Sequence, residues 1–253
     1  MNVYEGGDAA GEPVVFLHGG NVAGWMWGMQ LPAFEDFRQL VPDLPGFGAS
    51  NHEPWVSIAD TADRVAELIS ERAPGGAHLV GLSLGSSVAI EVAARHPELV
   101  RSLFLASAQL APPRRRSMLL ARILLRFWEQ RGFWTSTARS YGLRGEDAEL
   151  FVETGLGIRR ETALAIYDEV LRGVPAETLA RVSAPVVAVA GGRDSPAIHR
   201  DSLDRLRAAL PHSLRAIAPG MHHQWNIEDV ELFNAALRSW LTSREVSPLL
   251  TAR

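Results

Sequence analysis

Cysteine and lysine are both absent from this chain of 253 residues, in which all 25 basic residues are arginine. The absence of cysteine excludes a thiol nucleophile, a thiolate metal site and a disulfide. The absence of lysine excludes Schiff-base chemistry, a serine–lysine dyad and the lysine of a Walker-type phosphate loop. Any chemistry that the chain performs therefore depends on other side chains.

Long apolar runs and a large excess of either charge are also missing. The net charge is −4, which gives no electrostatic reason to expect nucleic acid or an acidic membrane as a partner. No run approaches the ~18 apolar residues of a membrane span. The segment Met1–Asp8 lacks the basic region and apolar stretch of a signal peptide. We therefore expect a cytoplasmic protein, a monomer or a homodimer, whose partner is a small-molecule substrate.

Apolar runs that resemble buried strands alternate with helical patterns along most of the chain. The predicted strands are Asn2–Glu5, Val14–Leu17, Gln39–Pro42, Ala77–Val80, Val100–Ala106, Pro185–Ala190 and Leu214–Ala218, and the predicted helices are Ile58–Arg72, Ser86–Arg95, Ser202–Leu210 and Val230–Leu241. The tail, Ser247–Arg253, is expected to be frayed. This alternation predicts an α/β fold with a mostly parallel sheet and helices on both faces.

The alternation stops after Ala106 for about 75 residues, which are helical in pattern and rich in arginine and aromatic side chains. Such an interruption indicates an insertion between two strands of one sheet. We predict a core domain formed by residues 1–108 and 183–253, and a helical cap formed by residues 109–182.

The most informative motif is Gly81-Leu82-Ser83-Leu84-Gly85, which lies between a predicted strand and a predicted helix. A serine on such a tight turn has its hydroxyl clear of both elements, and side chains in place of Gly81 and Gly85 would collide as the backbone folds back. The helix N-terminus favours negative charge next to the serine. The motif therefore predicts a nucleophile elbow with Ser83 as the nucleophile.

A serine hydroxyl needs a base, and the base needs an orienting acid. Catalytic groups of parallel sheets gather beyond the carboxyl ends of the strands. Asp194 follows one predicted strand, and His222 and His223 follow the next. The order serine, acid, histidine favours Asp194 as the acid and one of the two histidines as the base. The alternative for Asp194 is a helix N-cap for the segment after Pro196.

At this point the chain resembles the α/β-hydrolase fold superfamily over nearly its whole length. The matching segments are His18–Gly20, Asp43–Ser50, Gly81–Gly85, Gly191–Asp194 and Gly220–Glu228. The resemblance implies Ser83 as nucleophile, Asp194 as triad acid and, because Glu228-Asp229-Val230 occupies the place of the family's Glu-x-Pro, His223 as base. His222 then becomes a rim residue that touches substrate or solvent.

The resemblance also implies an oxyanion hole made of two backbone N–H groups. Leu84 supplies one, and Gly20 supplies the other, with Asn21 as the second choice. His18 is expected to be a structural donor near this loop. Many relatives have a glycine where this chain has Ser86, so looser packing of helix on strand is expected there.

The predicted cap carries an apolar stripe over Met118–Trp128 and further aromatic residues. Most of these side chains are expected to pack the cap onto the sheet, and some to line an apolar pocket. The predicted substrate-binding residues are Asn21, Trp25, Leu82, Phe127, Trp128, Trp134, His222 and Trp225. The basic run Arg114–Arg116 is expected to form a solvated face rather than a membrane surface.

These residues predict a serine hydrolase that cleaves a carboxylic ester or lactone of moderate size and apolar character. No metal or cofactor is implied. Two alternatives stay open: hydrolysis of a carbon–carbon bond in a ring-fission product with the same triad, and a low-turnover ligand receptor on the same fold. Substrate choice depends on the cap and the pocket lining, which the fold does not determine.

Overall fold

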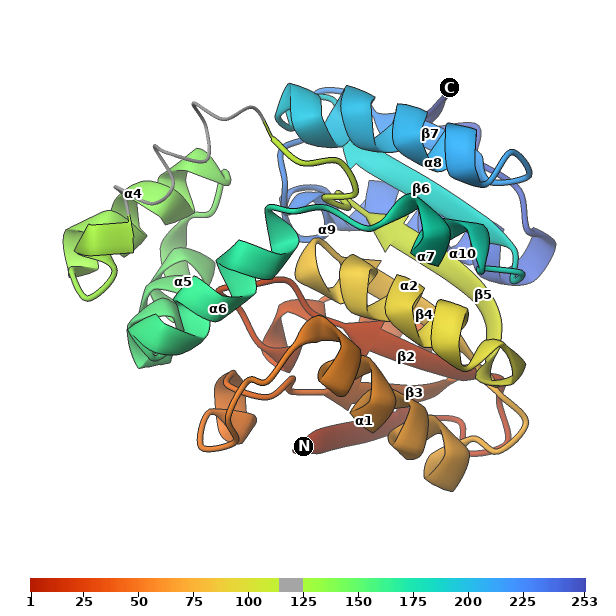
Figure 1. Ribbon diagram of the computed structural model, residues 1–253, viewed down its shortest axis with the longest axis horizontal. Helices are drawn as coiled ribbons and strands as arrows, with labels where there is room; N and C mark the ends of the chain where they lie inside the picture. The colour runs from red at the N-terminus through yellow and green to blue at the C-terminus, as the bar shows by residue number, and fades with distance from the viewer. Residues whose placement is uncertain (114–124) are drawn as a thin grey trace.

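The computed structural model describes residues 1–113 and 125–253, and a single twisted sheet of eight strands runs through it (Figure 1). The strands follow the order β1-β3-β2-β4-β5-β6-β7-β8. The two edge pairs, β1 with β3 and β7 with β8, are antiparallel, and the strands between them are parallel. The predicted α/β fold with a mostly parallel sheet is confirmed.

The strands are β1 (Val3–Gly7), β2 (Pro13–Leu17), β3 (Arg38–Pro42), β4 (Ala77–Leu82), β5 (Val100–Ala106), β6 (Val186–Gly191), β7 (Leu214–Ala218) and β8 (Thr251–Ala252). The longer helices are α1 (Ile58–Arg72), α2 (Leu84–Arg95), α4 (Arg131–Ser140), α5 (Gly145–Gly157), α6 (Arg160–Val170), α7 (Ala176–Ala180), α8 (Leu203–Ala209), α9 (Trp225–Glu228) and α10 (Val230–Ser243). Short 3-10 turns cover Gly24–Trp27, Leu31–Phe34, Gly48–Ser50, Pro97–Leu99 and Leu125–Phe127, and a π-helical turn covers Ala197–Ser202.

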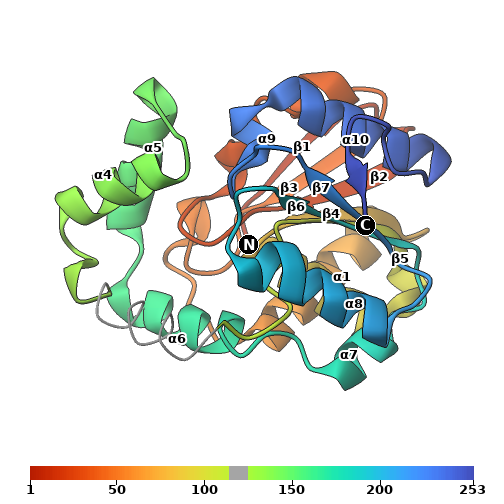
Figure 2. The same ribbon diagram turned by 90° about the horizontal axis from the view of Figure 1, so that it is seen from above.

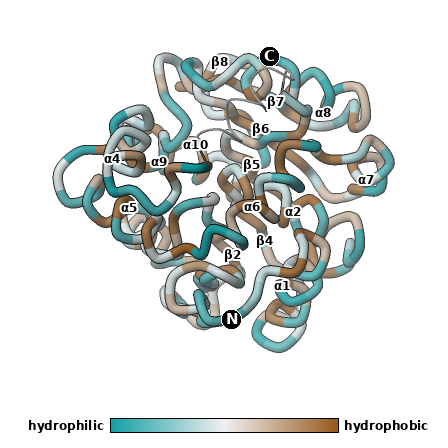
Figure 3. Tube along the Cα trace, turned by 60° about the vertical axis from the view of Figure 1, so that its left-hand side comes forward, coloured by the Kyte–Doolittle hydropathy of each residue, from teal (hydrophilic) through white to brown (hydrophobic). Residues whose placement is uncertain are grey.

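The central strands are apolar on both sides because helices cover both faces of the sheet. Every residue of β4 and β6 is buried. Helices α1, α2, α7 and α8 lie over one face and α10 over the other (Figure 2). Apolar residues are concentrated along the central strands and hydrophilic residues at the outer loops (Figure 3). No described helix has the length and apolar character that crossing a membrane requires.

Helices α4, α5 and α6 lie together beyond the carboxyl ends of the parallel strands, apart from the helices that cover the sheet (Figures 1 and 2). Helix α7, which also belongs to the stretch predicted as cap, packs instead beside α2 and α8. The division of the chain at residues 109 and 182 stays a prediction. Arg114–Arg116 and most of the Met118–Trp128 stripe lie outside the described residues.

The interior of the insertion is aromatic. Trp134 is fully buried and meets Trp128 edge to face, with ring centroids 4.4 Å apart, and its indole N–H donates to the Trp128 carbonyl at 2.6 Å. A Cβ added at Gly155 of α5 would lie 2.4 Å from the Trp134 ring. Glycine is therefore needed where α5 crosses this indole.

One prediction about the C-terminal part is wrong. The tail is not frayed, because Thr251 and Ala252 pair with Ile217 and Ala216 as an added edge strand. The helix expected over Ser202–Leu210 is present as α8, and a π-helical turn over Ala197–Ser202 precedes it.

Candidate active site

The backbone at Ser83 is strained in the way a nucleophile elbow requires. Its φ is 52° and its ψ is −108°, outside the regions that side chains other than glycine normally adopt. A Cβ at Gly81 would lie 2.5 Å from the Gly85 backbone, and one at Gly85 would lie 2.1 Å from the Leu17 carbonyl oxygen. The predicted collisions are therefore present. This geometry holds the Ser83 side chain at the start of α2, free of both neighbouring elements.

Ser86 tightens the elbow rather than loosening it. Its hydroxyl donates to the Gly81 carbonyl at 2.8 Å and lies 3.3 Å from the Ala106 carbonyl, and the side chain is fully buried. The looser packing expected at this position is absent because the hydroxyl links the start of α2 to β4 and β5.

Asp194 lies in the loop after β6, and its side chain is 2% exposed. One carboxylate oxygen, Oδ1, lies 2.8 Å from His223 Nδ1. The other accepts from the Ser107 hydroxyl at 2.6 Å and from the Gly191 N–H at 3.0 Å. Burial by itself raises the pKa of this carboxyl, but the charge of His223 and these hydrogen bonds outweigh it and lower the pKa below its usual range. Asp194 is therefore ionised at neutral pH, and both of its carboxylate oxygens have hydrogen-bond partners.

Ser107 was not among the residues that the sequence predicted for the site. It follows β5 directly, has a φ of 47° and is fully buried. A serine at a positive φ is uncommon. Here the Ser107 side chain on this unusual backbone donates its hydroxyl hydrogen bond to Asp194. The sequence carried no signal for this contact beyond the position of the residue at a strand end.

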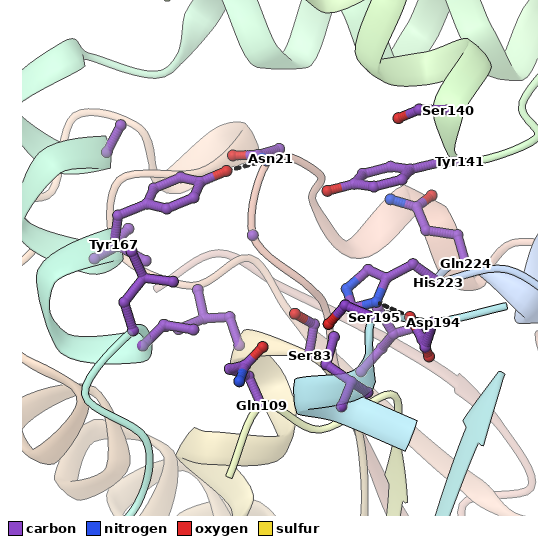
Figure 4. Close-up of a pocket in the computed structure, with 18 of the residues that line it drawn as sticks. Asn21, Ser83, Gln109, Ser140, Tyr141, Tyr167, Asp194, Ser195, His223 and Gln224 are labelled. Atoms are coloured by element: carbon purple, nitrogen blue, oxygen red, sulfur yellow. Dashed lines mark hydrogen bonds and ion pairs between the residues drawn. The ribbon is translucent and has the colours of Figure 1, made fainter. Parts of the chain in front are cut away.

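His223 contacts Asp194 and lines the same cavity as Ser83. The bond from Nδ1 to Asp194 leaves Nε2 as the ring nitrogen available to Ser83, which faces the same cavity (Figure 4). The Tyr141 ring lies beside the imidazole, with ring centroids 5.5 Å apart. This is the orientation that a general base in a serine triad needs.

His222 has a different partner. Its Nδ1 lies 2.8 Å from Glu228 Oε1, and its backbone N–H donates to Oε2 of the same carboxylate at 2.6 Å. His222 lines the cavity as expected of a rim residue. The geometry thus assigns the Asp194 contact to His223 and separates the two adjacent imidazoles.

The loop after β2 supplies the candidate oxyanion hole. Gly20, Asn21 and Leu84 all line the cavity beside Ser83. Asn21 has a φ of 71°, and its amide donates to the Tyr167 hydroxyl of α6 at 3.2 Å. The loop is therefore held from the insertion as well as from the core.

His18 supports the same loop from below. Its Nδ1 lies 2.8 Å from the Gly19 carbonyl, and its Nε2 accepts from the Leu44 N–H at 2.9 Å. Complete burial lowers the pKa of His18 to about 4. A neutral imidazole with both nitrogens in use is a structural link between two loops and has no capacity left to act as a base.

The cavity above Ser83 has a volume of about 340 Å³. Its apolar lining includes Phe47, Leu82, Leu84, Trp128, Ile158, Ala163, Ile166, Val170, Leu171 and Ile198, and its polar lining includes Asn21, Gln109, Ser140, Tyr141, Tyr167, Arg193, Ser195, His222 and Gln224. Asn21, Leu82, Trp128 and His222 lie where the sequence analysis expected substrate contacts. Gln109 and Gln224 were missed, because no motif or period distinguishes them. Tyr141 and Tyr167 belong to the aromatic residues of the predicted cap, some of which were expected to line a pocket, but they were not among the predicted contacts.

Four predicted lining residues do not line this cavity. The Trp25 indole donates to Thr154 of α5 at 3.0 Å. Phe127 is 44% exposed, and Trp134 is buried inside the insertion. Trp225 is buried against Phe233, with ring centroids 4.5 Å apart. Aromatic bulk near the site was the only signal for them, and it does not determine which way a ring turns.

Among the described residues, no group of three or more histidine, aspartate and glutamate side chains is arranged to hold a metal ion.

Comparison with known proteins identifies the family of the chain. The model of the alpha/beta hydrolase family matches residues 14–236. The chain belongs to the alpha/beta hydrolase family. An AB hydrolase superfamily protein of Gibberella zeae is 27% identical over 96% of this chain and 84% of its own length. A pimeloyl-[acyl-carrier protein] methyl ester esterase of Vibrio cholerae is 35% identical over 41% of this chain and 39% of its own length.

A solved structure has the same fold over nearly the whole chain. A thermophilic esterase from Thermogutta terrifontis, solved with malate bound, superposes with a TM-score of 0.77 and 25% identity over 95% of this chain and 92% of its own. The superposition therefore covers nearly the whole length of both chains.

Proposed function

We propose that this alpha/beta hydrolase family member is a serine hydrolase that cleaves a carboxylic ester or lactone through an acyl-enzyme. The observation that carries the proposal is the pairing of Asp194 with His223 at 2.8 Å, next to a strained Ser83, on the floor of one cavity. Ester hydrolysis is also the activity named for the esterases of Vibrio cholerae and Thermogutta terrifontis.

In the first half-reaction, Ser83 Oγ forms a bond to the carbonyl carbon while His223 Nε2 takes the hydroxyl proton. The N–H groups of Leu84 and Gly20 stabilise the negative charge on the carbonyl oxygen, and each such donor typically contributes ~3 kcal/mol. The bond to the alcohol oxygen then breaks, and His223 returns the proton to that oxygen. Asp194 keeps the imidazole in the required orientation throughout.

In the second half-reaction, a water molecule replaces the alcohol. His223 takes a proton from the water, and the resulting hydroxide attacks the acyl carbon. The bond between the acyl carbon and Ser83 Oγ breaks, and the serine recovers its proton from His223. No step of this cycle calls for a group that the chain lacks.

The test is hydrolysis of p-nitrophenyl acetate, butyrate and octanoate by the wild type and by the variants Ser83→Ala, His223→Ala and His222→Ala. We expect turnover by the wild type and a loss of at least ~10⁴-fold in kcat for the first two variants. His222→Ala should lose far less, because its partner is Glu228.

Two outcomes would contradict the proposal. Loss of activity in His222→Ala but not in His223→Ala would transfer the role of base to the neighbouring residue. A folded wild type that turns over none of these esters would favour carbon–carbon cleavage or ligand binding.

A further inference from the structure

The cavity has two chemically different walls. One is formed by α6, where Ala163, Ile166 and Val170 recur at helical spacing and face the cavity together with Trp128. The other is formed by the C-terminal end of α4 and the loop that carries His223, and it presents Ser140, Tyr141 and Gln224. In Figure 4, Tyr141 and Gln224 lie on the His223 side of the cavity and Tyr167 of α6 lies across from them.

The polar wall carries hydrogen-bonding capacity that the protein does not use. Gln224 is 1% exposed, and its Oε1 is buried with no hydrogen-bond partner within the described part of the chain, so this amide becomes available to a ligand when it turns toward the cavity. The Tyr141 hydroxyl points into the cavity (Figure 4) and bonds to no described residue. Burial raises the pKa of Tyr141, so its hydroxyl stays protonated and can donate. Unpaired buried polar groups are costly, and this cost is removed when a ligand supplies the missing partner.

The polar wall also lies where the alcohol portion of an ester must go. The proposed mechanism requires His223 to give its proton to the leaving oxygen, so that oxygen must lie beside the imidazole. Tyr141 flanks the same imidazole at 5.5 Å, and Gln224 follows His223 directly in the chain. The apolar face of α6, on the other side of the cavity, offers a surface for the acyl chain.

We propose that this enzyme is specific for esters of apolar acids with alcohols that carry a further hydroxyl or amide group, which Tyr141 and Gln224 recognise. The inference rests on the proposed function and adds the chemical class of the leaving group. Ser140 contributes an acceptor at the outer edge, since its hydroxyl already donates to the Thr137 carbonyl at 2.7 Å.

The test compares two butyrate esters of nearly equal size, 2-hydroxyethyl butyrate and propyl butyrate, by titration of the released acid. We expect the wild type to prefer the hydroxyethyl ester by ~10-fold in kcat/KM, the effect of one or two hydrogen bonds. The variants Tyr141→Phe and Gln224→Met keep the shape of the wall and should reduce this preference toward unity. Both variants should have a lower kcat/KM for the hydroxyethyl ester and a nearly unchanged kcat/KM for the propyl ester.

Ser136→Ala is the matched control, because Ser136 is exposed on the same helix and does not line the cavity. It should keep the wild-type preference. Equal rates for the two esters in the wild type, or a preference that both variants retain, would overturn the inference while leaving ester hydrolysis intact. Failure of the wild type on both esters would instead contradict the proposed function.

A third ester, of butyric acid with glycolic acid, separates hydrogen bonding from recognition of charge. Arg193 also lines the cavity. If the glycolate ester were the best substrate and the hydroxyethyl ester no better than propyl, the wall would select an anion, and the proposal would be wrong.

Discussion

The two halves of the site, the catalytic residues of the core and the wall of the cavity, differ in how completely their polar groups are paired. On the core side, both oxygens of Asp194 and both nitrogens of His18 have partners within the protein. In the cavity wall, the Tyr141 hydroxyl of the insertion is open to the cavity, and Gln224 Oε1, from a loop of the core, has no partner among the described residues. Paired groups hold a fixed constellation for chemistry, whereas open groups are available to recognise a ligand. We therefore expect the chemical step to depend on the catalytic residues of the core and the choice of substrate to depend on the cavity wall.

Acid pH should destabilise the core domain through its histidines. All eight histidines lie outside residues 109–182. Burial and then the Arg244 guanidinium lower the pKa of His78 to about 4, against its ordinary value of 6.5, and its Nδ1 lies 2.8 Å from the Ser102 hydroxyl. Between pH 4 and pH 6.5, His78 is therefore more protonated in the unfolded chain than in the folded one. The free energy of unfolding decreases as the pH falls from about 6.5 toward 4.

The expected loss from His78 alone is about 2 kcal/mol between pH 7.5 and pH 5. Urea unfolding at these two pH values should show it, and His78→Gln should reduce the pH dependence by this amount. His212→Gln, at an exposed histidine, should leave the pH dependence as in the wild type. An unchanged pH dependence in His78→Gln would mean that His78 titrates normally in the folded protein.

A smaller effect should follow from a change inside the insertion. Gly155→Ala places a methyl group 2.4 Å from the Trp134 ring, which in turn contacts Trp128 at the cavity wall. Overpacking of this kind typically costs 1–3 kcal/mol. We expect a lower melting temperature together with a raised KM for octanoate esters, because the Trp128 wall is displaced while the triad stays in place.

Gly157→Ala, in the same helix, is the control for this variant. A Cβ added at Gly157 has no atom within 4 Å of it. It should change stability by no more than about 1 kcal/mol, in the stabilising direction that helix propensity favours. If Gly155→Ala lowered kcat but not the affinity for the acyl chain, the two halves of the site would be less independent than the comparison implies.

The core half was predictable from the sequence because its constraints are local. Gly81 and Gly85 are required by atoms a few residues or one strand away, and Asp194 and His223 follow directly after strands. The cavity wall was not predictable, because it depends on how α4, α5 and α6 are placed on the core. Trp128 and Trp134 are equally aromatic and six positions apart in the chain, yet one lines the cavity and the other lies buried behind it.

The smallest expected effect tests the link between the halves. Tyr167→Phe removes the hydroxyl that accepts from the Asn21 amide at 3.2 Å. Asn21 follows Gly20, the candidate oxyanion donor, and has a strained φ of 71°. Loss of one hydrogen bond worth about 1 kcal/mol should lower kcat by about 5-fold, because the Gly20 N–H is held less firmly in the transition state. KM should change less.

A double-mutant cycle with Asn21→Gly isolates this contact, since glycine tolerates the positive φ and has no amide to donate. If the hydrogen bond carries the coupling, the double variant loses no more activity than either single variant. Additive losses would mean that Tyr167 and Asn21 act separately, so that the insertion shapes the cavity without supporting the oxyanion loop. Tyr4→Phe, at a tyrosine 53% exposed on β1, controls for the loss of a hydroxyl away from the site. Non-additive losses would mean that the insertion contributes to the chemical step through the oxyanion loop. The separation of chemistry from recognition would then apply to the triad but not to the oxyanion hole.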